Sequence, residues 1–229
     1  MSAPVMNKLV NGIIRRELRS AAARHMSGRL LDIGCGTKPY AAMLSEFVEQ
    51  HIGVDHEGST HGKNFVDLIG TAYHVPVTNT SFDCVLCSAV LEHLEEPEKA
   101  LRECFRVLKP GGKAIYLVPF IWHLHEQPRD FYRFTKYGLH YLFTKVGFSV
   151  VELKALSGFW VTFGQLLVYK LHPLNRGFLR WLRLMDALEL AIQGASYVAD
   201  HLDRAEKWTW MYLVVAVKPQ QEIDTSKLT

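Results

Sequence analysis

The sequence predicts an α/β domain in which helices cover a parallel sheet. Short apolar runs of strand type recur along the chain, helical or loop segments separate them, and a glycine turn follows the first run. The chain has 229 residues, 48% of them hydrophobic, which suits one domain with a sizeable core. The formal net charge is only +3 and the basic residues are scattered, so nucleic acid is not expected as a partner.

The elements follow in order along the chain. A helix is expected from Asn7 to His25, within an N-terminal segment of residues 1–26. Five runs of strand type come next, and two more close the chain. They are RLLDIG (29–34), HIGVD (51–55), NFVDL (64–68), FDCVLCS (82–88), KAIYLVPF (113–120), FSVVELKAL (148–156) and WMYLVVAVKP (210–219).

Two helices are expected between the later strands. In EPEKALRECFRVLKPGG, Pro97 suits the first turn, apolar residues repeat at helical spacing, and Pro110-Gly111-Gly112 ends the helix. A second helix should run from about Thr135 to Val146 and end at Gly147.

The glycine turn in LLDIGCGTKPY indicates a nucleotide site. Gly34 and Gly36 let a ligand approach the backbone closely, and Asp55 at the end of the next strand suits ribose hydroxyls. The dinucleotide pattern requires a third glycine where this chain has Pro39. The carboxylate of Asp32 would repel a pyrophosphate but favour a cationic amino-acid group. These features favour S-adenosylmethionine over NAD.

These motifs, together with GVD and SFDCVLCSAVLEHLEEPEKALRECFRVLKPGGKAIYLVPF, resemble the class I S-adenosylmethionine-dependent methyltransferases. The resemblance covers roughly residues 29–120 and 208–219, and is to the methyltransferase type 11-like small-molecule group, which includes quinone-biosynthesis C-methyltransferases. It implies a Rossmann-like, doubly wound, seven-stranded sheet with six parallel strands and an antiparallel seventh. It also implies an enzyme of class EC 2.1.1.- with S-adenosyl-L-methionine as cofactor.

By position, the resemblance implies a cofactor site around the glycine turn. Asp32, Gly34 and Gly36 would hold the methionine end and Asp55 the ribose. Thr71-Ala72 stands where the family usually has Asp-Ala before the adenine. The residues that we expect at the cofactor are Asp32, Gly34, Cys35, Gly36, Asp55, His56, Thr71, Ala72, Cys87 and Ser88.

The acceptor site is expected in PFIWHLHEQPRDFYRFT, just beyond the fifth strand. His125 there, or His93 after the fourth strand, is a candidate base. Candidate contacts to the acceptor are His123, Arg129, Tyr132 and Arg133. A structural alternative for this stretch stays open, in which Arg133 pairs with Asp130 and Thr135 caps the next helix.

No metal site is expected from the sequence. The His-x-His-Glu run lacks further ligands, and no second pair has metal-ligand spacing. Cys84 and Cys87 lie on a predicted strand, where residues three apart point to opposite faces. They are therefore interpreted as buried thiols.

The segment from Gly158 to Lys207 is an insert between the sixth and seventh strands. It reads as two helices broken at His172-Pro173, and we expect the second to separate two kinds of residue onto different faces. One face would carry Arg176, Arg180 and Arg183, and the other Phe178, Trp181, Met185, Leu188 and Ile192. A lid that buries the apolar stripe is favoured. A peripheral membrane contact and a homodimer interface are the alternatives.

The function predicted is methyl transfer to a small, partly apolar organic acceptor by a single domain (1–219) with a flexible tail (220–229). No signal peptide or membrane span is read, so a cytoplasmic protein is expected. Three alternatives stay open: a non-catalytic binding or regulatory protein on this fold, a membrane-peripheral enzyme with a lipid-linked acceptor, and a dehydrogenase. The last is opposed by Pro39.

Overall fold

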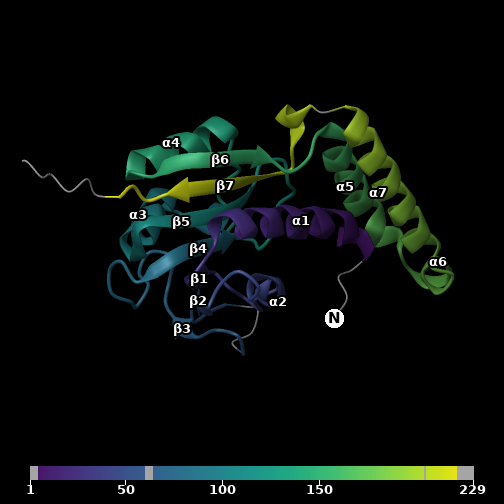
Figure 1. The fold of residues 1–229 in the computed structure, drawn as a ribbon. Helices are drawn as coiled ribbons and strands as arrows, with labels where there is room; N and C mark the ends of the chain where they lie inside the picture. The colour runs from purple at the N-terminus through teal and green to yellow at the C-terminus, as the bar shows by residue number, and fades with distance from the viewer. Residues whose placement is uncertain (1–4, 60–63, 204, 221–229) are drawn as a thin grey trace, which may run out of the picture.

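The computed structural model describes residues 5–59, 64–203 and 205–220, without the side chains of residues 178 and 180. Its strands form one sheet in the order β3-β2-β1-β4-β5-β7-β6 (Figure 1). β7 is antiparallel to both β5 and β6, and all other pairs are parallel. The predicted sheet of six parallel strands with an antiparallel seventh is confirmed. The strands are β1 (Arg29–Ile33), β2 (Gln50–Asp55), β3 (Leu68–Ile69), β4 (Phe82–Ser88), β5 (Leu108–Pro119), β6 (Ser149–Ala155) and β7 (Met211–Val217).

Helices cover both faces of the sheet, because side chains alternate along each buried strand. Leu31 and Cys87 belong to the apolar core under one pair of helices, and Leu30 and Cys84 to the core under the other pair. Cys84 and Cys87 are buried free thiols on opposite faces, as predicted. The first pair is α3 (Pro97–Val107) and α4 (Lys136–Val146), and the second is α1 (Lys8–His25) and α2 (Ala41–Leu44).

Two predicted boundaries were wrong. The third strand was expected at residues 64–68, but only Leu68–Ile69 pairs with β2, because the Asp67 side chain instead accepts hydrogen bonds from the backbone N–H of Gly53 and from Lys38. The helix expected to end at Pro110 ends at Val107, and β5 runs through the Pro-Gly-Gly segment.

The insert is a helical hairpin at one end of the sheet (Figure 1). The expected break at His172-Pro173 is present as a short 3-10 turn. The second helix is broken again at Arg183, whose backbone φ is +54°. The elements are α5 (Phe159–Leu171), η3 (His172–Leu174), α6 (Gly177–Trp181) and α7 (Leu184–Leu202).

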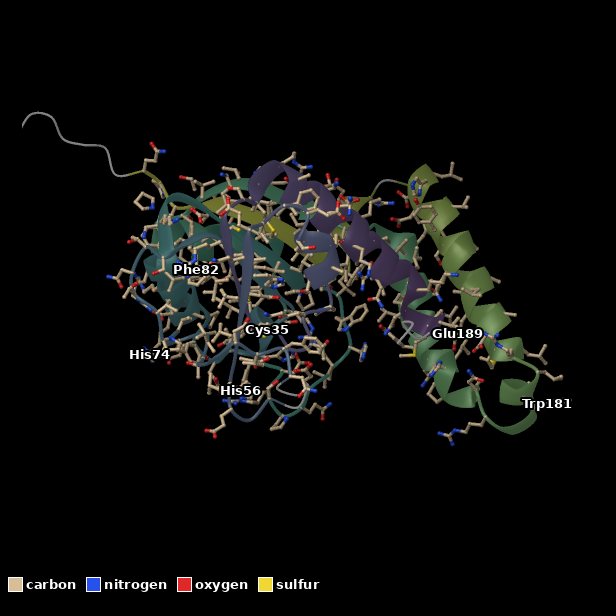
Figure 2. The ribbon with its side chains drawn as sticks, turned by 60° about the horizontal axis from the view of Figure 1, so that its bottom comes forward. Cys35, His56, His74, Phe82, Trp181 and Glu189 are labelled. Atoms are coloured by element: carbon tan, nitrogen blue, oxygen red, sulfur yellow. The ribbon has the colours of Figure 1, made fainter. Side chains whose placement is uncertain are left out.

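The expected faces of the second insert helix were wrong. Met185 is buried, but Trp181 is 77% exposed and Leu188 is also exposed. Because Arg183 breaks the helix, Arg176 and Arg183 do not share a face of one continuous helix. The predictions for the side chains of Phe178 and Arg180 lie outside the described part of the structure. The buried face of α7 is largely polar, and Figure 2 shows Glu189 on the side toward α1 and Trp181 at the outer end of the hairpin. Its buried polar residues are Glu189, Gln193 and Ser196.

This polar face binds the backbone where the chain enters α1. Gln193 accepts a hydrogen bond from the Leu9 N–H (2.8 Å) and donates one to the Val5 carbonyl (3.0 Å). Gln165 on α5 donates to the Met6 carbonyl at 2.8 Å. A buried backbone group needs a polar partner, which explains why polar side chains face inward here.

Candidate active site

The glycine turn lies between β1 and α2, at the carboxyl end of the sheet. Gly34 and Gly36 both have left-handed backbone, with φ of +69° and +49°. A Cβ added at Gly34 would come within 2.4 Å of Val90, so this position requires glycine for space as well as conformation. The Gly36 N–H donates to Asp55 Oδ2 at 2.9 Å, which ties the turn to the end of β2.

Two carboxylates flank this turn. Asp55 is buried, and its second oxygen accepts from the His56 N–H at 2.8 Å. Asp32 is also buried; burial raises its pKa, while His51 opposes the rise, with Nε2 2.9 Å from Asp32 Oδ2. Two acidic groups at the turn suit a ligand with an ammonium group and a diol, and disfavour a pyrophosphate.

A cavity of about 810 Å³ opens beside the turn, large enough for a nucleoside cofactor. Nine of the ten predicted cofactor residues line it. Cys87 does not; it lies in the core near Tyr116. The lining residues that were predicted are Asp32, Gly34, Cys35, Gly36, Asp55, His56, Thr71, Ala72 and Ser88, together with the predicted base His93 and Arg129.

Several residues that line this cavity were not predicted from the sequence. Tyr40 follows the glycine turn in the same motif, and Tyr73 follows Thr71-Ala72, so their positions in the motifs were the available signal. Thr71 itself accepts hydrogen bonds from the N–H groups of Tyr73 and His74, which shapes the loop as a turn. Asp67, a second acid near this loop, does not line the cavity.

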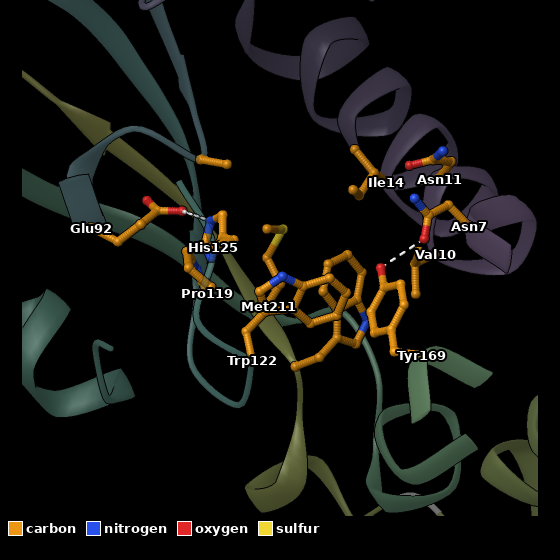
Figure 3. A pocket seen from close by; sticks show the side chains of 12 residues that line it. Asn7, Val10, Asn11, Ile14, Glu92, Pro119, Trp122, His125, Tyr169 and Met211 are labelled. Carbon is orange, nitrogen blue, oxygen red and sulfur yellow. Dashed lines mark hydrogen bonds and ion pairs between the residues drawn. The ribbon is translucent and has the colours of Figure 1, made fainter. Parts of the chain in front are cut away.

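A smaller cavity of about 190 Å³ lies between α1, α5 and the end of the sheet (Figure 3). Its wall is mainly aromatic and aliphatic, and Tyr169 on α5 donates a hydrogen bond to Asn7 at 2.7 Å. Glu92 and His125 supply polar groups at one end. Ala89, just after β4, lines both cavities. The lining residues are Asn7, Val10, Asn11, Ile14, Ala89, Glu92, Pro119, Trp122, His125, Tyr169, Trp210 and Met211.

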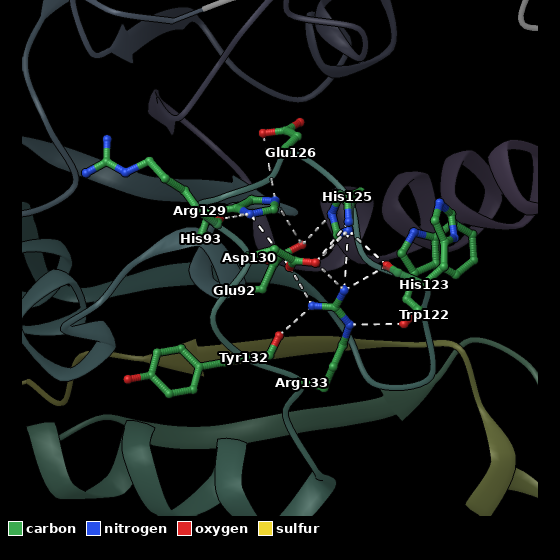
Figure 4. Close-up of polar contacts among 10 residues, drawn as sticks. All are labelled: Glu92, His93, Trp122, His123, His125, Glu126, Arg129, Asp130, Tyr132 and Arg133. Atoms are coloured by element: carbon green, nitrogen blue, oxygen red, sulfur yellow. Dashed lines mark hydrogen bonds and ion pairs between the residues drawn. The ribbon is translucent and has the colours of Figure 1, made fainter.

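The loop after β5 is held by Asp130 and Arg133 (Figure 4). Both guanidinium Nη atoms lie 2.7 Å from the Asp130 carboxylate, which holds the pKa of that carboxyl well below its usual range. The remaining donors of Arg133 reach the carbonyls of Trp122, His123 and Tyr132. The Thr135 hydroxyl accepts from the Gly138 N–H and caps α4. These contacts match the structural alternative for this stretch.

The other residues predicted at the acceptor lie apart from one another. The His123 ring packs on Tyr169, with centroids 4.6 Å apart, and burial lowers its pKa. Tyr132 donates to the Glu95 carbonyl and lies outside both cavities. Arg129 is exposed at the rim of the larger cavity, with its guanidinium 3.3 Å from Glu95.

The two predicted bases meet at a residue that the sequence analysis did not single out. Glu92 is fully buried between His93 and His125, and its Oε1 lies 3.8 Å from Nε2 of each ring. The Glu92 carboxylate raises the pKa of His125, while desolvation opposes this rise. The signal available in the sequence was the Glu-His pair in LEHLEE directly after the fourth strand.

Comparison with known proteins assigns this fold and turn to a family. Residues 31–116 match the methyltransferase domain family. An uncharacterized protein, MJ1123 of Methanocaldococcus jannaschii, is 29% identical over 65% of this chain and 73% of its own length. Demethylmenaquinone methyltransferase of Renibacterium salmoninarum is 34% identical over 44% of this chain and 45% of its own length.

Most of the first curated relatives are matched over about half of their own length. Among solved structures, the [4+2]-cyclase SpnF superposes with a TM-score of 0.59 over 89% of this chain and 81% of that one, at 21% identity. That likeness shows the fold alone, since one fold hosts different reactions. The family match over residues 31–116, the seven-stranded sheet and the acidic glycine turn agree: this chain carries a methyltransferase domain with the fold of the class I S-adenosylmethionine-dependent enzymes.

Proposed function

We propose that this chain methylates a small, partly apolar acceptor that occupies the smaller cavity. The observation that carries the proposal is the meeting of the two cavities at Ala89. The larger cavity has the acidic groups that suit S-adenosylmethionine, and the smaller one is mainly apolar with Glu92 and His125 at one end. An acceptor seated there would present its polar atom toward the cofactor.

Different residues would bind the cofactor, orient the acceptor and take up its proton. Asp32 and Asp55 would hold the amino and ribose groups of the cofactor, which supplies a methyl group activated by a sulfonium. Trp122 and Tyr169 wall the smaller cavity, orient the apolar part of the acceptor and exclude water. Because the displacement is in line, alignment of acceptor and methyl group is the main task of the protein. His93 and His125 lie where a proton of the acceptor could be taken up.

The relatives support an apolar acceptor of this kind. One of them is named for methylation of demethylmenaquinone, and others for ubiquinone and menaquinone biosynthesis. The alternative of a non-catalytic protein is disfavoured, because a binding protein needs no second cavity with a buried carboxylate beside the cofactor site.

Calorimetric titration with S-adenosylmethionine, S-adenosylhomocysteine and NAD tests the cofactor assignment. We expect micromolar binding of the first two and none of NAD. Mass spectrometry of a panel of quinols, phenols and amines incubated with S-adenosylmethionine would then identify the acceptor. A folded protein that binds neither adenosyl ligand would contradict the proposed function.

Filling the smaller cavity should impair the use of the acceptor and leave cofactor binding unchanged. We expect Asn11→Trp to lower kcat/KM for the acceptor at least about tenfold, because the indole occupies a cavity of about 190 Å³. The affinity for S-adenosylhomocysteine should stay within about twofold. Lys8→Trp, at an exposed position on the same helix, is the matched control. Equal activity of the two variants would place the acceptor elsewhere.

The exposed face of α7 favours a second candidate, in which the acceptor is lipid-linked and the hairpin rests on a membrane surface. Apolar side chains project from this face, and Arg183 is exposed beside them. No helix in the described part of the chain is long and apolar enough to span a membrane. The exposed apolar residues are Trp181, Leu182, Leu184, Leu188, Leu190, Val198 and Leu202.

Vesicle flotation tests this candidate. We expect the chain to float with vesicles that contain anionic phospholipid, and Leu184→Glu/Leu188→Glu to reduce the bound fraction at least about fivefold. Tyr137→Glu, which changes an exposed aromatic residue on the distant helix α4, should bind like the parent chain. A protein that stays unbound, or that sediments as a dimer through α7, would reject the membrane candidate.

A further inference from the structure

Glu92, His93 and His125 form a cluster whose histidines are hydrogen-bonded to the loop after β5. One ligand atom from each residue lies within 4.8 Å of the other two. The rings of His93 and His125 meet edge to face, with centroids 4.7 Å apart. The cluster stands between the two cavities, because His93 lines the larger one while Glu92 and His125 line the smaller one.

Both imidazoles present the Nε2 nitrogen to Glu92. His93 Nδ1 lies 2.6 Å from the Arg129 carbonyl, which can only accept, so this nitrogen carries a proton and Nε2 faces Glu92. His125 Nδ1 lies 3.3 Å from the His123 carbonyl and 3.5 Å from Asp130, with Arg133 Nη2 at 3.4 Å. These contacts hold the Nδ1 side of the ring against the loop and leave Nε2 facing Glu92.

The Glu92 carboxylate lacks a partner suited to its burial. The residue has no exposed surface, and neither carboxylate oxygen has a hydrogen-bond partner among the described residues. The same holds for His93 Nε2. Burying a carboxylate without compensation costs several kcal/mol, so such groups are normally paired or bound to a metal.

We propose that Glu92, His93 and His125 bind one divalent transition-metal ion. Two imidazole nitrogens and one carboxylate oxygen are a ligand set of zinc enzymes and of other first-row metals, and an Nδ1–H bonded to a carbonyl or a carboxylate is the usual support of such a histidine. Metal bonds of about 2.0–2.2 Å set tetrahedral ligand atoms about 3.3–3.6 Å apart, so the two 3.8 Å separations of Glu92 Oε1 from Nε2 would shorten only slightly. Because the cluster lines both cavities, a ligand could reach the ion from either one.

The catalytic use of this ion rests on the proposed function. With the metal bound, neither imidazole would have a free lone pair to take up the acceptor's proton. The metal would instead bind a hydroxyl oxygen of the acceptor and lower its pKa, so that the proton leaves to water. The oxygen lone pair then forms the new C–O bond while the S–CH3 bond breaks. The products are the methyl ether, S-adenosylhomocysteine and the released proton. This selects acceptors that carry a hydroxyl group within the small cavity.

Metal binding is tested on the tag-free full chain without any acceptor. After removal of metal by chelation, the protein is dialysed against Zn²⁺ or Co²⁺ and its metal content is measured, with Co²⁺ also followed by its visible absorption. Glu92→Gln, His93→Gln and His125→Gln are compared with His140→Gln, an exposed histidine on α4. Circular dichroism verifies that each variant is folded.

We expect one metal per chain in the parent protein and in His140→Gln, and at least about tenfold weaker binding in the three cluster variants. Zn²⁺ at about 100 times Kd should raise Tm by about 5–10 °C in the first two proteins. Co²⁺ should give a visible spectrum without the strong ultraviolet band of cysteine ligation. Glu92→Gln should keep or raise the Tm of the metal-free chain, because it removes a buried charge.

Two results would overturn the metal site: a folded parent chain that retains no stoichiometric metal, or metal retained by Glu92→Gln and His125→Gln. Failure of the proposed function gives a different pattern. In that case the metal is bound through the cluster, but no adenosyl ligand binds in calorimetry. If both ligands bind while activity is unchanged by chelation, the site stands and its catalytic use is rejected.

Discussion

Asp55→Asn is expected to weaken the binding of S-adenosylhomocysteine by about 10–100-fold. The substitution keeps one oxygen that can accept from the Gly36 N–H, but its amide NH2 cannot accept from the His56 N–H. It also removes the charge that would strengthen the proposed hydrogen bonds to the ribose hydroxyls. One or two such bonds account for about 1.4–2.7 kcal/mol. Titration calorimetry measures the change directly.

Asp67→Asn is the matched control for this experiment. Asp67 also lies near the end of β2 and also accepts a backbone N–H, from Gly53 at 2.6 Å, but it does not line the cofactor cavity. Its variant should bind within about threefold of the parent chain. Similar losses in both variants would mean that the effect comes from the shape of the turn and not from contact with the ribose.

Arg133→Ala is expected to lower the free energy of unfolding by about 3–5 kcal/mol. The Asp130 side chain is only 2% exposed, and it would lose both charged hydrogen bonds while three carbonyls would lose a donor. Chemical denaturation followed by tryptophan fluorescence measures the change. The loop that carries His125 should also become mobile, so methyl transfer should fall.

Arg129→Ala separates a structural role from a role in binding the acceptor. Arg129 is on the same loop, but its side chain is 62% exposed and its ion pair with Glu95 is at the surface. Such pairs contribute about 0–1 kcal/mol, so stability should hardly change. The Arg133→Ala variant could instead leave stability unchanged and only raise KM for an anionic acceptor. In that case Arg133 would bind the acceptor and would not stabilise the loop.

The sequence predicted the sheet and the cofactor turn because their signals are local. Strand runs are short and apolar, and the glycines, Asp32 and Asp55 stand at fixed offsets along one βαβ unit. The same locality explains the prediction that Thr135 caps α4. The predicted bounds of the third strand were wrong because a tertiary contact of Asp67 with Gly53, 14 residues earlier in the chain, outweighed strand propensity.

The acceptor site and the insert could not be predicted in the same way. Glu92 contacts His125 only because the loop after β5 folds back beside it. No hydrophobic periodicity in the sequence predicts that contact. The face of α7 was assigned from its apolar stripe, but its neighbours are backbone amides of residues 5–9, which select Gln193 instead. Sequence patterns describe a helix, whereas burial depends on what lies against it.

The two cavities are lined by different parts of the chain. The matched family region, 31–116, supplies most of the wall of the larger cavity, whereas the wall of the smaller cavity, the proposed acceptor site, comes largely from 7–14, 119–125, 169 and 210–211. If the smaller cavity holds the acceptor, substrate choice depends on segments outside the matched domain, and exchanging the hairpin and N-terminal helix between relatives should transfer it.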